Sequence, residues 1–206
     1  EKAEYLVTKL LEGTNIAVIT DAGTPAISDP GEDLVRLCHE NGIEVCAVPG
    51  PVAFATALCV SGFPTGRFCF EGFLSVNKVS RKEHLNEIKN EKRTLVFYEA
   101  PHKLLNTLKD MYRVLGERNI AIVKEITKLH ETVMRTTFSE SIDFFELNQP
   151  RGEYVIIIEG KTDGEITEYT LDTAVKLAKD LMESGVSASV AAKEAASPAL
   201  SICSPF

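Results

Sequence analysis

The stretch NIAVITDAGTPAISDPG, residues 15–31, sets an apolar run directly before a polar loop. Residues 15–20 predict a short buried strand, because the run is continuous, apolar and followed by turn-forming residues. The loop, residues 21–31, holds two aspartates, two glycines and two prolines. Helical spacing follows in residues 32–41, and a second apolar run, residues 43–48, predicts another strand. This alternation is typical of a parallel sheet covered by helices on both faces.

The second half of the sequence has a different pattern. Beyond a short linker, apolar runs predict five further strands, at residues 67–74, 93–100, 119–126, 131–138 and 153–160. Only some of them are separated by helical patterns, and consecutive strands without a helix between them pair antiparallel. We therefore predict an α/β protein with two domains and a tail: a parallel-sheet domain in residues 1–66, a mixed-sheet domain in 67–160 and a short helical tail in 161–206.

Composition limits the class of protein. The 206 residues are 44% hydrophobic and 25% charged, which suits a folded chain with one large or two small cores. The sequence has neither a long apolar run nor a signal-peptide pattern, so we expect a cytoplasmic protein with no membrane partner. Five cysteines without a C-x-x-C pair predict neither a disulfide framework nor a metal site. Because the sequence starts at Glu1 inside an amphipathic pattern, we expect the natural protein to extend upstream.

Two loops at strand ends form the predicted ligand site. In open parallel sheets, ligands bind beyond the carboxyl ends of the strands, where loops lead into helices. Residues 21–31 occupy one such place, and the turn VPGPVA, residues 48–53, occupies the next. Asp21 and Asp29 can accept hydrogen bonds from a ligand, although Asp29 could instead cap the following helix. Neither a P-loop nor a G-x-G-x-x-G motif is present in the sequence.

Six sequence blocks resemble one known family. They are TDAGTPAISDPG, VPGPVAFATAL, SGFPTGRFCFEGFL, RTLVFYEAPHKLL, KEITKLHE and RGEYVIIIEG. Together they are similar to the tetrapyrrole methylase superfamily, and within it to the enzymes that methylate a cytidine 2′-hydroxyl in 16S ribosomal RNA. The resemblance implies the two-domain fold of that family, here with a truncated parallel-sheet N-terminal domain, because the family's opening strand and loop have no counterpart in this sequence.

The resemblance also implies a cofactor, a substrate and an assembly. Members of the family bind S-adenosylmethionine between their domains, act as homodimers and, in the branch that this chain resembles, modify 16S rRNA in the small ribosomal subunit. The residues that inherit the cofactor-binding role are Asp21, Ala22, Gly23, Thr24, Pro25, Ile27, Pro51, Val52, Ala53, Glu99, Ala100 and Thr127. Lys103 stands where the family usually has arginine, and a lysine cannot make the planar bidentate contact of a guanidinium.

Methyl transfer to a ribose hydroxyl requires alignment of two groups and removal of one proton. The candidates for catalytic groups are Asp21, Glu99, Lys124 and Glu125. Lys124 and Glu125 could instead form an ion pair at the end of a strand. Since the family's opening segment is absent, we expect these 206 residues alone to be inactive.

Charge is distributed unevenly along the chain, whose formal net charge is −8. Residues 78–128 contain twelve Lys or Arg against seven Asp or Glu, a net of +5, and both flanking segments are acidic. This segregation predicts an RNA-contacting face, or else a solvated helix surface. The predicted RNA-binding residues are Lys78, Arg81, Lys82, His102 and Lys103. Phe73 and Tyr98 could stack on a base, but their strand-like surroundings favour core positions.

Three other functions fit parts of the pattern. A corrin or precorrin methylase would share the fold and the cofactor but has no need for the basic segment. The two loops could bind a nucleotide without transferring a methyl group. The fragment could also serve only in dimerisation.

Overall fold

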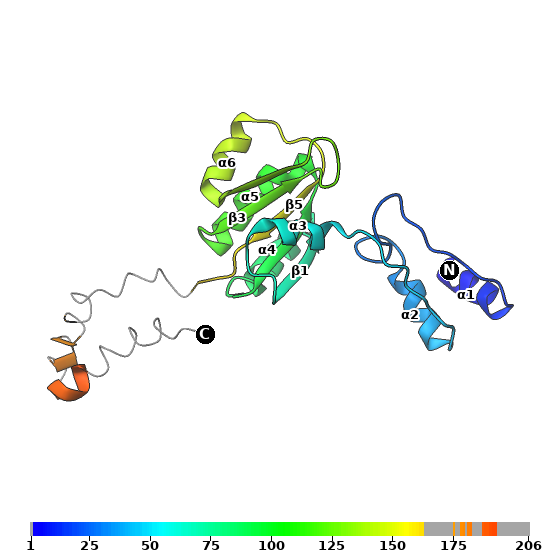
Figure 1. The fold of residues 1–206 in the computed structure, drawn as a ribbon, viewed down its shortest axis with the longest axis horizontal. Coiled ribbons are helices and arrows are strands. Elements are labelled where there is room, and N and C mark those ends of the chain that lie inside the picture. The colour runs from blue at the N-terminus through cyan, green and yellow to red at the C-terminus, as the bar shows by residue number, and fades with distance from the viewer. Residues whose placement is uncertain (1, 163–174, 176–177, 180, 183–186, 193–206) are drawn as a thin grey trace. The chain divides into compact units, whose positions relative to one another are not determined.

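The computed structural model describes residues 2–162, 175, 178–179, 181–182 and 187–192. The chain divides into two units, residues 1–161 and 162–206, and Figure 1 shows the helices and the sheet of the first unit. The helices of the first unit are α1 (Lys2–Leu11), α2 (Glu32–Glu40), α3 (Ala53–Ser61), α4 (Lys78–Glu87), α5 (Pro101–Leu115) and α6 (Phe138–Leu147). Its strands are β1 (Phe68–Phe73), β2 (Thr94–Glu99), β3 (Asn119–Lys124), β4 (Thr132–Thr137) and β5 (Tyr154–Ile158). Most of the predicted helical tail, residues 161–206, lies outside the described residues.

The five strands form one mixed sheet in the order β1-β2-β5-β3-β4. β1 and β2 run parallel, whereas β5 is antiparallel to both of its neighbours and β4 is antiparallel to β3. Each strand falls within one of the five runs predicted for residues 67–160, and the mixed pairing is confirmed. The carboxyl ends of β1, β2 and β3 therefore lie at the same edge of the sheet.

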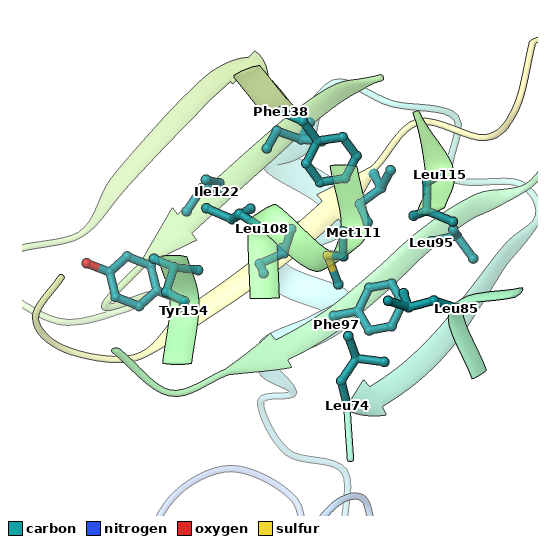
Figure 2. Packing of buried hydrophobic residues seen from close by; sticks show 14 of the residues in the cluster. Leu74, Leu85, Leu95, Phe97, Leu108, Met111, Leu115, Ile122, Phe138 and Tyr154 are labelled. Atoms are coloured by element: carbon teal, nitrogen blue, oxygen red, sulfur yellow. The ribbon is translucent and has the colours of Figure 1, made fainter. Parts of the chain in front are cut away.

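Side chains alternate between two hydrophobic clusters along each strand. One cluster packs the sheet against α4, α5 and α6, and Figure 2 shows Leu108, Met111 and Phe138 meeting strand residues there. On the other face, Ala57 and Leu58 of α3 pack against side chains of β2, β3 and β5. Because both faces of the central strands β2, β3 and β5 are covered, these strands read as continuous apolar runs rather than alternating ones.

The two strands predicted at residues 15–20 and 43–48 do not form. Within residues 2–162 neither segment joins a sheet, and Ile19 is 87% exposed and Val48 86% exposed. The helix after each segment does form, since α2 begins at the predicted residue Glu32 and α3 begins at Ala53, where the second loop ends. A strand needs a neighbour for its N–H and C=O groups, and the described chain offers none to these segments. The prediction of strands here was therefore wrong, although the mixed α/β fold class is confirmed.

Candidate functional site

The two loops of the predicted ligand site contact each other. The hydroxyl Oγ1 of Thr24 donates a hydrogen bond to the carbonyl oxygen of Pro51 at 3.2 Å. Gly23 has φ 77°, and a Cβ there would lie 3.3 Å from the same carbonyl oxygen. A Cβ at Gly50 would likewise lie 3.3 Å from Thr24 Oγ1. Glycine at both positions therefore lets the loops approach closely.

The first loop also holds non-glycine residues in the left-handed region. Ala26 and Ser28 both have φ 65°. Such a conformation costs roughly 1–3 kcal/mol at a non-glycine residue and is concentrated at functional sites. Asp21 and Asp29 are exposed in this loop. Asp29 does not cap α2, because the N-cap position of that helix is occupied by Gly31 and no side chain makes a capping hydrogen bond there. Both carboxylates are therefore open to solvent, where a cationic or hydroxyl-bearing ligand could reach them.

Tyr98 connects the second loop to the sheet. Its hydroxyl accepts a hydrogen bond of 3.0 Å from the backbone N–H of Phe54, in the first turn of α3. Burial raises the pKa of Tyr98, the hydrogen bond from Phe54 lowers it, and the negative charge of Asp29 adds to the increase. Tyr98 is half-buried near the carboxyl end of β2, so both loops and the sheet edge converge on this side chain. This anchoring role could not be predicted from the sequence, because no local pattern indicates it.

The register of the sheet brings the remaining candidates to this edge. Glu99 and Lys124 both lie opposite Tyr154 of β5, one from each side. In the chain, Ala100 follows Glu99, and Glu125 and Thr127 come shortly after Lys124. The structure therefore places all five predicted residues from the ends of β2 and β3 at the edge where Tyr98 meets the loops. Their roles in binding or catalysis stay predictions.

Glu99 faces away from Tyr98, towards α5. Its carboxylate is buried and accepts hydrogen bonds from Thr107 Oγ1 at 2.5 Å and from the backbone N–H of Ala100 at 2.8 Å. Thr107 lies on the apolar face of α5, between Leu104 and Leu108. The two hydrogen bonds join the end of β2 to α5. The Glu99 carboxylate thus forms its hydrogen bonds within the fold.

Glu125 is also held by its neighbours. Its Oε1 accepts hydrogen bonds from the backbone N–H of Glu153 at 2.8 Å and from Lys128 Nζ at 3.2 Å. The bond from the Glu153 backbone is the main reason why the pKa of Glu125 is lowered, and the bond from Lys128 adds to it. The ion-pair partner of Glu125 is therefore Lys128 rather than Lys124. Thr127, whose N–H donates to Glu131 at 2.6 Å, lies in the same turn.

The predicted RNA-binding residues differ in exposure. Lys78, Lys82 and His102 are exposed and Lys103 is half-buried. Lys78 and Lys82 line a shallow hollow of about 520 Å³ along α4. Arg81 differs, because its side chain is only 14% exposed and its guanidinium bonds Asp110 at 2.8 Å and the carbonyl oxygen of Ser75 at 3.0 Å. Asp110 neutralises this cation, so Arg81 links α4 to α5.

The expectation that Phe73 belongs to the core was wrong. This side chain at the carboxyl end of β1 is 56% exposed rather than part of the core. Its ring centroid lies 5.5 Å from that of Tyr98. An exposed aromatic ring therefore stands beside the point where the loops meet the sheet.

Among the residues that the structure describes, no group of three or more His, Cys, Asp or Glu side chains could hold a metal ion. No described helix is both long enough and apolar enough to cross a membrane.

Comparison with known families identifies the class of protein. The family model for tetrapyrrole (corrin/porphyrin) methylases matches residues 1–141, and the chain belongs to this family. The ribosomal RNA small subunit methyltransferase I of Haemophilus influenzae is 49% identical over 179 residues, which are 85% of this chain and 63% of that protein. The protein of the same name from Synechocystis is 41% identical over 196 residues, 95% of this chain and 70% of the relative. The chain thus spans less than two thirds of the first relative.

Solved structures share the fold at low sequence identity. The methyltransferase CobJ superposes with a TM-score of 0.58 at 19% identity, covering 79% of this chain and 72% of CobJ. The uroporphyrin-III C-methyltransferase of Thermus thermophilus, complexed with S-adenosylhomocysteine, gives a TM-score of 0.51 at 18% identity and covers 82% of this chain and 76% of that one. These similarities support the mixed α/β fold class.

Proposed function

We propose that this chain belongs to an S-adenosylmethionine-dependent methyltransferase that modifies a cytidine 2′-hydroxyl of 16S rRNA within the small ribosomal subunit. The observation that carries the proposal is the meeting of the two loops with Tyr98, through the Thr24–Pro51 and Phe54–Tyr98 hydrogen bonds. The names of the more similar relatives support ribosomal RNA as the substrate. A homodimer in the cytoplasm is part of the same proposal.

The residues at the loops fit the proposed cofactor. S-Adenosylmethionine supplies a methyl group on a sulfonium cation, and the exposed carboxylates of Asp21 and Asp29 give the loop the opposite charge. The close contact of Gly23 with Pro51 leaves two stretches of loop backbone side by side, which suits recognition of a polar ligand. The residues proposed to hold the cofactor are Asp21, Ala22, Gly23, Thr24, Pro25, Ile27, Pro51, Val52, Ala53, Glu99, Ala100 and Thr127.

For the catalytic group we favour two of the four candidates. Glu99 and Glu125 already accept two hydrogen bonds each from the protein. For Asp21 and Lys124 no hydrogen bond or ion pair to a described residue is found, so their side chains remain available to a substrate. The proposed work of these groups is to orient the ribose hydroxyl and to take up or offset its proton.

The cofactor part is tested by Asp21→Ala in the full-length protein. Loss of a charge-assisted hydrogen bond should weaken S-adenosylmethionine binding by about 1–3 kcal/mol, measured by titration calorimetry. Asp33→Ala is the matched control, since Asp33 is an exposed acid on α2 that pairs with Arg36. Equal affinities for Asp21→Ala and the unsubstituted protein would mean that the loop is only structural.

The RNA part is tested through exposed cations of the basic segment. Lys78→Glu with Lys82→Glu should weaken small-subunit binding and flatten its salt dependence by roughly two units of slope. Arg81 is left unchanged, because reversing its charge would place it against Asp110 and disturb the fold. Arg67→Glu with Lys89→Glu is the control, because both side chains are exposed and neither forms an ion pair within the described part of the chain. Unchanged subunit binding in the Lys78 and Lys82 variant would mean that these lysines belong only to a solvated helix face and do not contact RNA.

The alternatives give distinct outcomes in the same assays. A corrin or precorrin methylase would bind S-adenosylmethionine but leave small subunits unmethylated. A nucleotide-binding or dimerisation module would transfer no methyl group to either substrate. We also propose that these 206 residues alone are inactive, because the segments that lead into both loops are unpaired. Methyl incorporation into small subunits by the 206 residues alone would contradict that part of the proposal.

A further inference from the structure

Phe73 owes its direction to an irregularity in β1. Phe70 lies opposite Val96 of β2, whereas Gly72 lies opposite Phe97, so the register shifts between them. In a regular strand, residues three apart point to opposite faces. The extra residue puts Phe70 and Phe73 on the same face, and Gly72 with φ 63° permits the bulge. Without it, Phe73 would point towards the face covered by α4 and α5.

The redirected ring stands at one end of a row of five contacting aromatic rings, which are Phe73, Tyr98, Phe70, Phe54 and Phe68. Phe73 contacts Tyr98 with centroids 5.5 Å apart, and Tyr98 contacts Phe70 edge-on at 5.1 Å. Phe70 in turn stacks on Phe54 of α3 at 4.4 Å. The Tyr98 hydroxyl is fixed by the N–H of Phe54. Phe73 is therefore supported from beneath by packed side chains, while more than half of its own surface faces solvent.

Cations follow the ring closely in the chain. After the buried Leu74, a short turn leads to α4, whose N-cap Asn77 accepts from the N–H groups of Val79 and Ser80. The Arg81 guanidinium holds this turn through the carbonyl oxygen of Ser75. Lys78 and Lys82 then project from the first turns of α4, and neither forms an ion pair within the described part of the chain. Lys78 follows Phe73 by five residues, at the start of the helix that begins at the same edge of the sheet. Exposed lysines at an edge that also carries an exposed ring favour a nucleotide over an apolar protein surface.

We propose that Phe73 is a base-stacking residue, on which an unpaired base of the RNA substrate lies while Lys78 and Lys82 face the adjacent phosphates. The inference rests on the proposed function, in which the substrate is RNA. An aromatic ring accepts the face of any base, and single-stranded RNA is commonly recognised by such stacking combined with backbone cations. Phe73 would thus hold the target strand next to the loops that are proposed to bind the cofactor.

A tryptophan at this position gives a direct probe, because the sequence contains no other. In full-length Phe73→Trp, emission excited at the red edge of the protein spectrum is compared with that of the unsubstituted full-length protein, and the difference reports on residue 73. Titration with an unlabelled single-stranded oligocytidylate of about ten nucleotides should quench the tryptophan emission as the base stacks, while a fluorescein-labelled copy in a parallel titration reports binding by its anisotropy. Emission that stays constant at RNA concentrations that saturate the oligonucleotide's anisotropy would contradict the proposal.

A second set of variants measures the effect on the reaction. Phe73→Ala should raise the KM for unmethylated small subunits by about tenfold or more, whereas Phe73→Tyr keeps a ring and should stay near the unsubstituted protein. Phe144→Ala is the matched control, since Phe144 on α6 is 46% exposed and contacts Phe145. S-Adenosylmethionine affinity, measured by calorimetry, should be the same in all of these proteins.

The outcomes separate this inference from the proposed function. An active unsubstituted protein with an unaffected Phe73→Ala variant would overturn the stacking role alone. Loss of cofactor affinity or a changed oligomeric state in Phe73→Ala, with RNA affinity intact, would also overturn it. An unsubstituted protein that transfers no methyl group to small subunits, yet loses RNA affinity with Phe73→Ala, would contradict the proposed function and support the stacking role.

Discussion

The sheet region, residues 68–158, and the loop region, residues 14–52, contain the same kind of sequence pattern but form different structures. Both contain short apolar runs followed by polar residues. In the sheet region the runs pair with each other, and Ile156 at the centre of β5 is completely buried. In the loop region the runs have no neighbour, and Ile19 is almost fully exposed.

The comparison shows that the loops do not depend on those runs for their local shape. Thr24 still contacts Pro51, and Phe54 still contacts Tyr98, although residues 15–20 and 43–48 form no strand. The Thr24–Pro51 bond joins the two loops of the loop region, and the Phe54–Tyr98 bond fixes the helix that follows them to the sheet region. This arrangement places the proposed binding chemistry in a region, residues 14–52, where Cys38 is the one buried hydrophobic side chain.

The largest expected effect contrasts two isoleucines. Ile156→Ala should lower the free energy of unfolding by about 2–5 kcal/mol, because it removes buried carbon and leaves a cavity. Ile19→Ala should change it by less than about 0.5 kcal/mol, since that side chain is already in water. Urea denaturation followed by circular dichroism measures both. Equal losses would mean that residues 15–20 are packed in solution and would break the comparison.

The next effect concerns the buried carboxylate of the sheet region. Thr107→Val keeps the shape of the side chain but removes the hydrogen bond to Glu99, which should cost about 1–3 kcal/mol of unfolding free energy. Thr136→Val is the control, because the hydroxyl of Thr136 bonds Glu140 in an exposed position. If both variants lost the same small amount of unfolding free energy, the Glu99 carboxylate would be solvated rather than held by α5.

The third effect tests the connection between the regions. Tyr98→Phe removes the acceptor for the N–H of Phe54 and should destabilise the fold by about 0.5–1.5 kcal/mol. Cofactor affinity should fall as well, because the start of α3 is no longer fixed to β2. Tyr112→Phe on α5 is a suitable control, since this tyrosine contacts Phe138 through its ring. Undiminished cofactor affinity in Tyr98→Phe would mean that the loops bind the cofactor without needing their connection to the sheet region.

The central strands β2, β3 and β5 could be predicted because their apolar runs are continuous and long enough to identify. The same signal at residues 15–20 gave a wrong prediction, since a strand also requires a partner that the run itself does not specify. The candidate residues of β2 and β3 reach one edge as expected. Glu99 is different, because its partner Thr107 lies on a helix whose apolar spacing gives no sign of a hydrogen bond to β2.

Side-chain direction was the least predictable property of the site. Strand alternation would place Phe73 opposite to Phe70, and only the bulge at Gly72 puts both rings on one face. Likewise, nothing near Arg81 in the sequence indicates that Asp110, 29 residues further along, neutralises its charge. Both cases depend on contacts between elements, which periodicity and spacing do not encode.

The smallest expected effect is a pH dependence within the sheet region. Arg93 at the start of β2 donates to the carboxylate of Glu91 and holds the pKa of Glu91 at about 2, against 4.5 for the free side chain. Because the folded-state pKa is depressed, the pair stabilises the fold fully above about pH 4.5, and this contribution is lost as the pH falls towards 2. Glu91→Gln should therefore unfold with a weaker pH dependence between these values, measured by acid titration at low salt. The effect should be small, since both side chains are partly exposed and screened by solvent. An unaltered acid transition in Glu91→Gln would mean that this pair contributes nothing to folding and that the order of the sheet region rests on its two hydrophobic clusters.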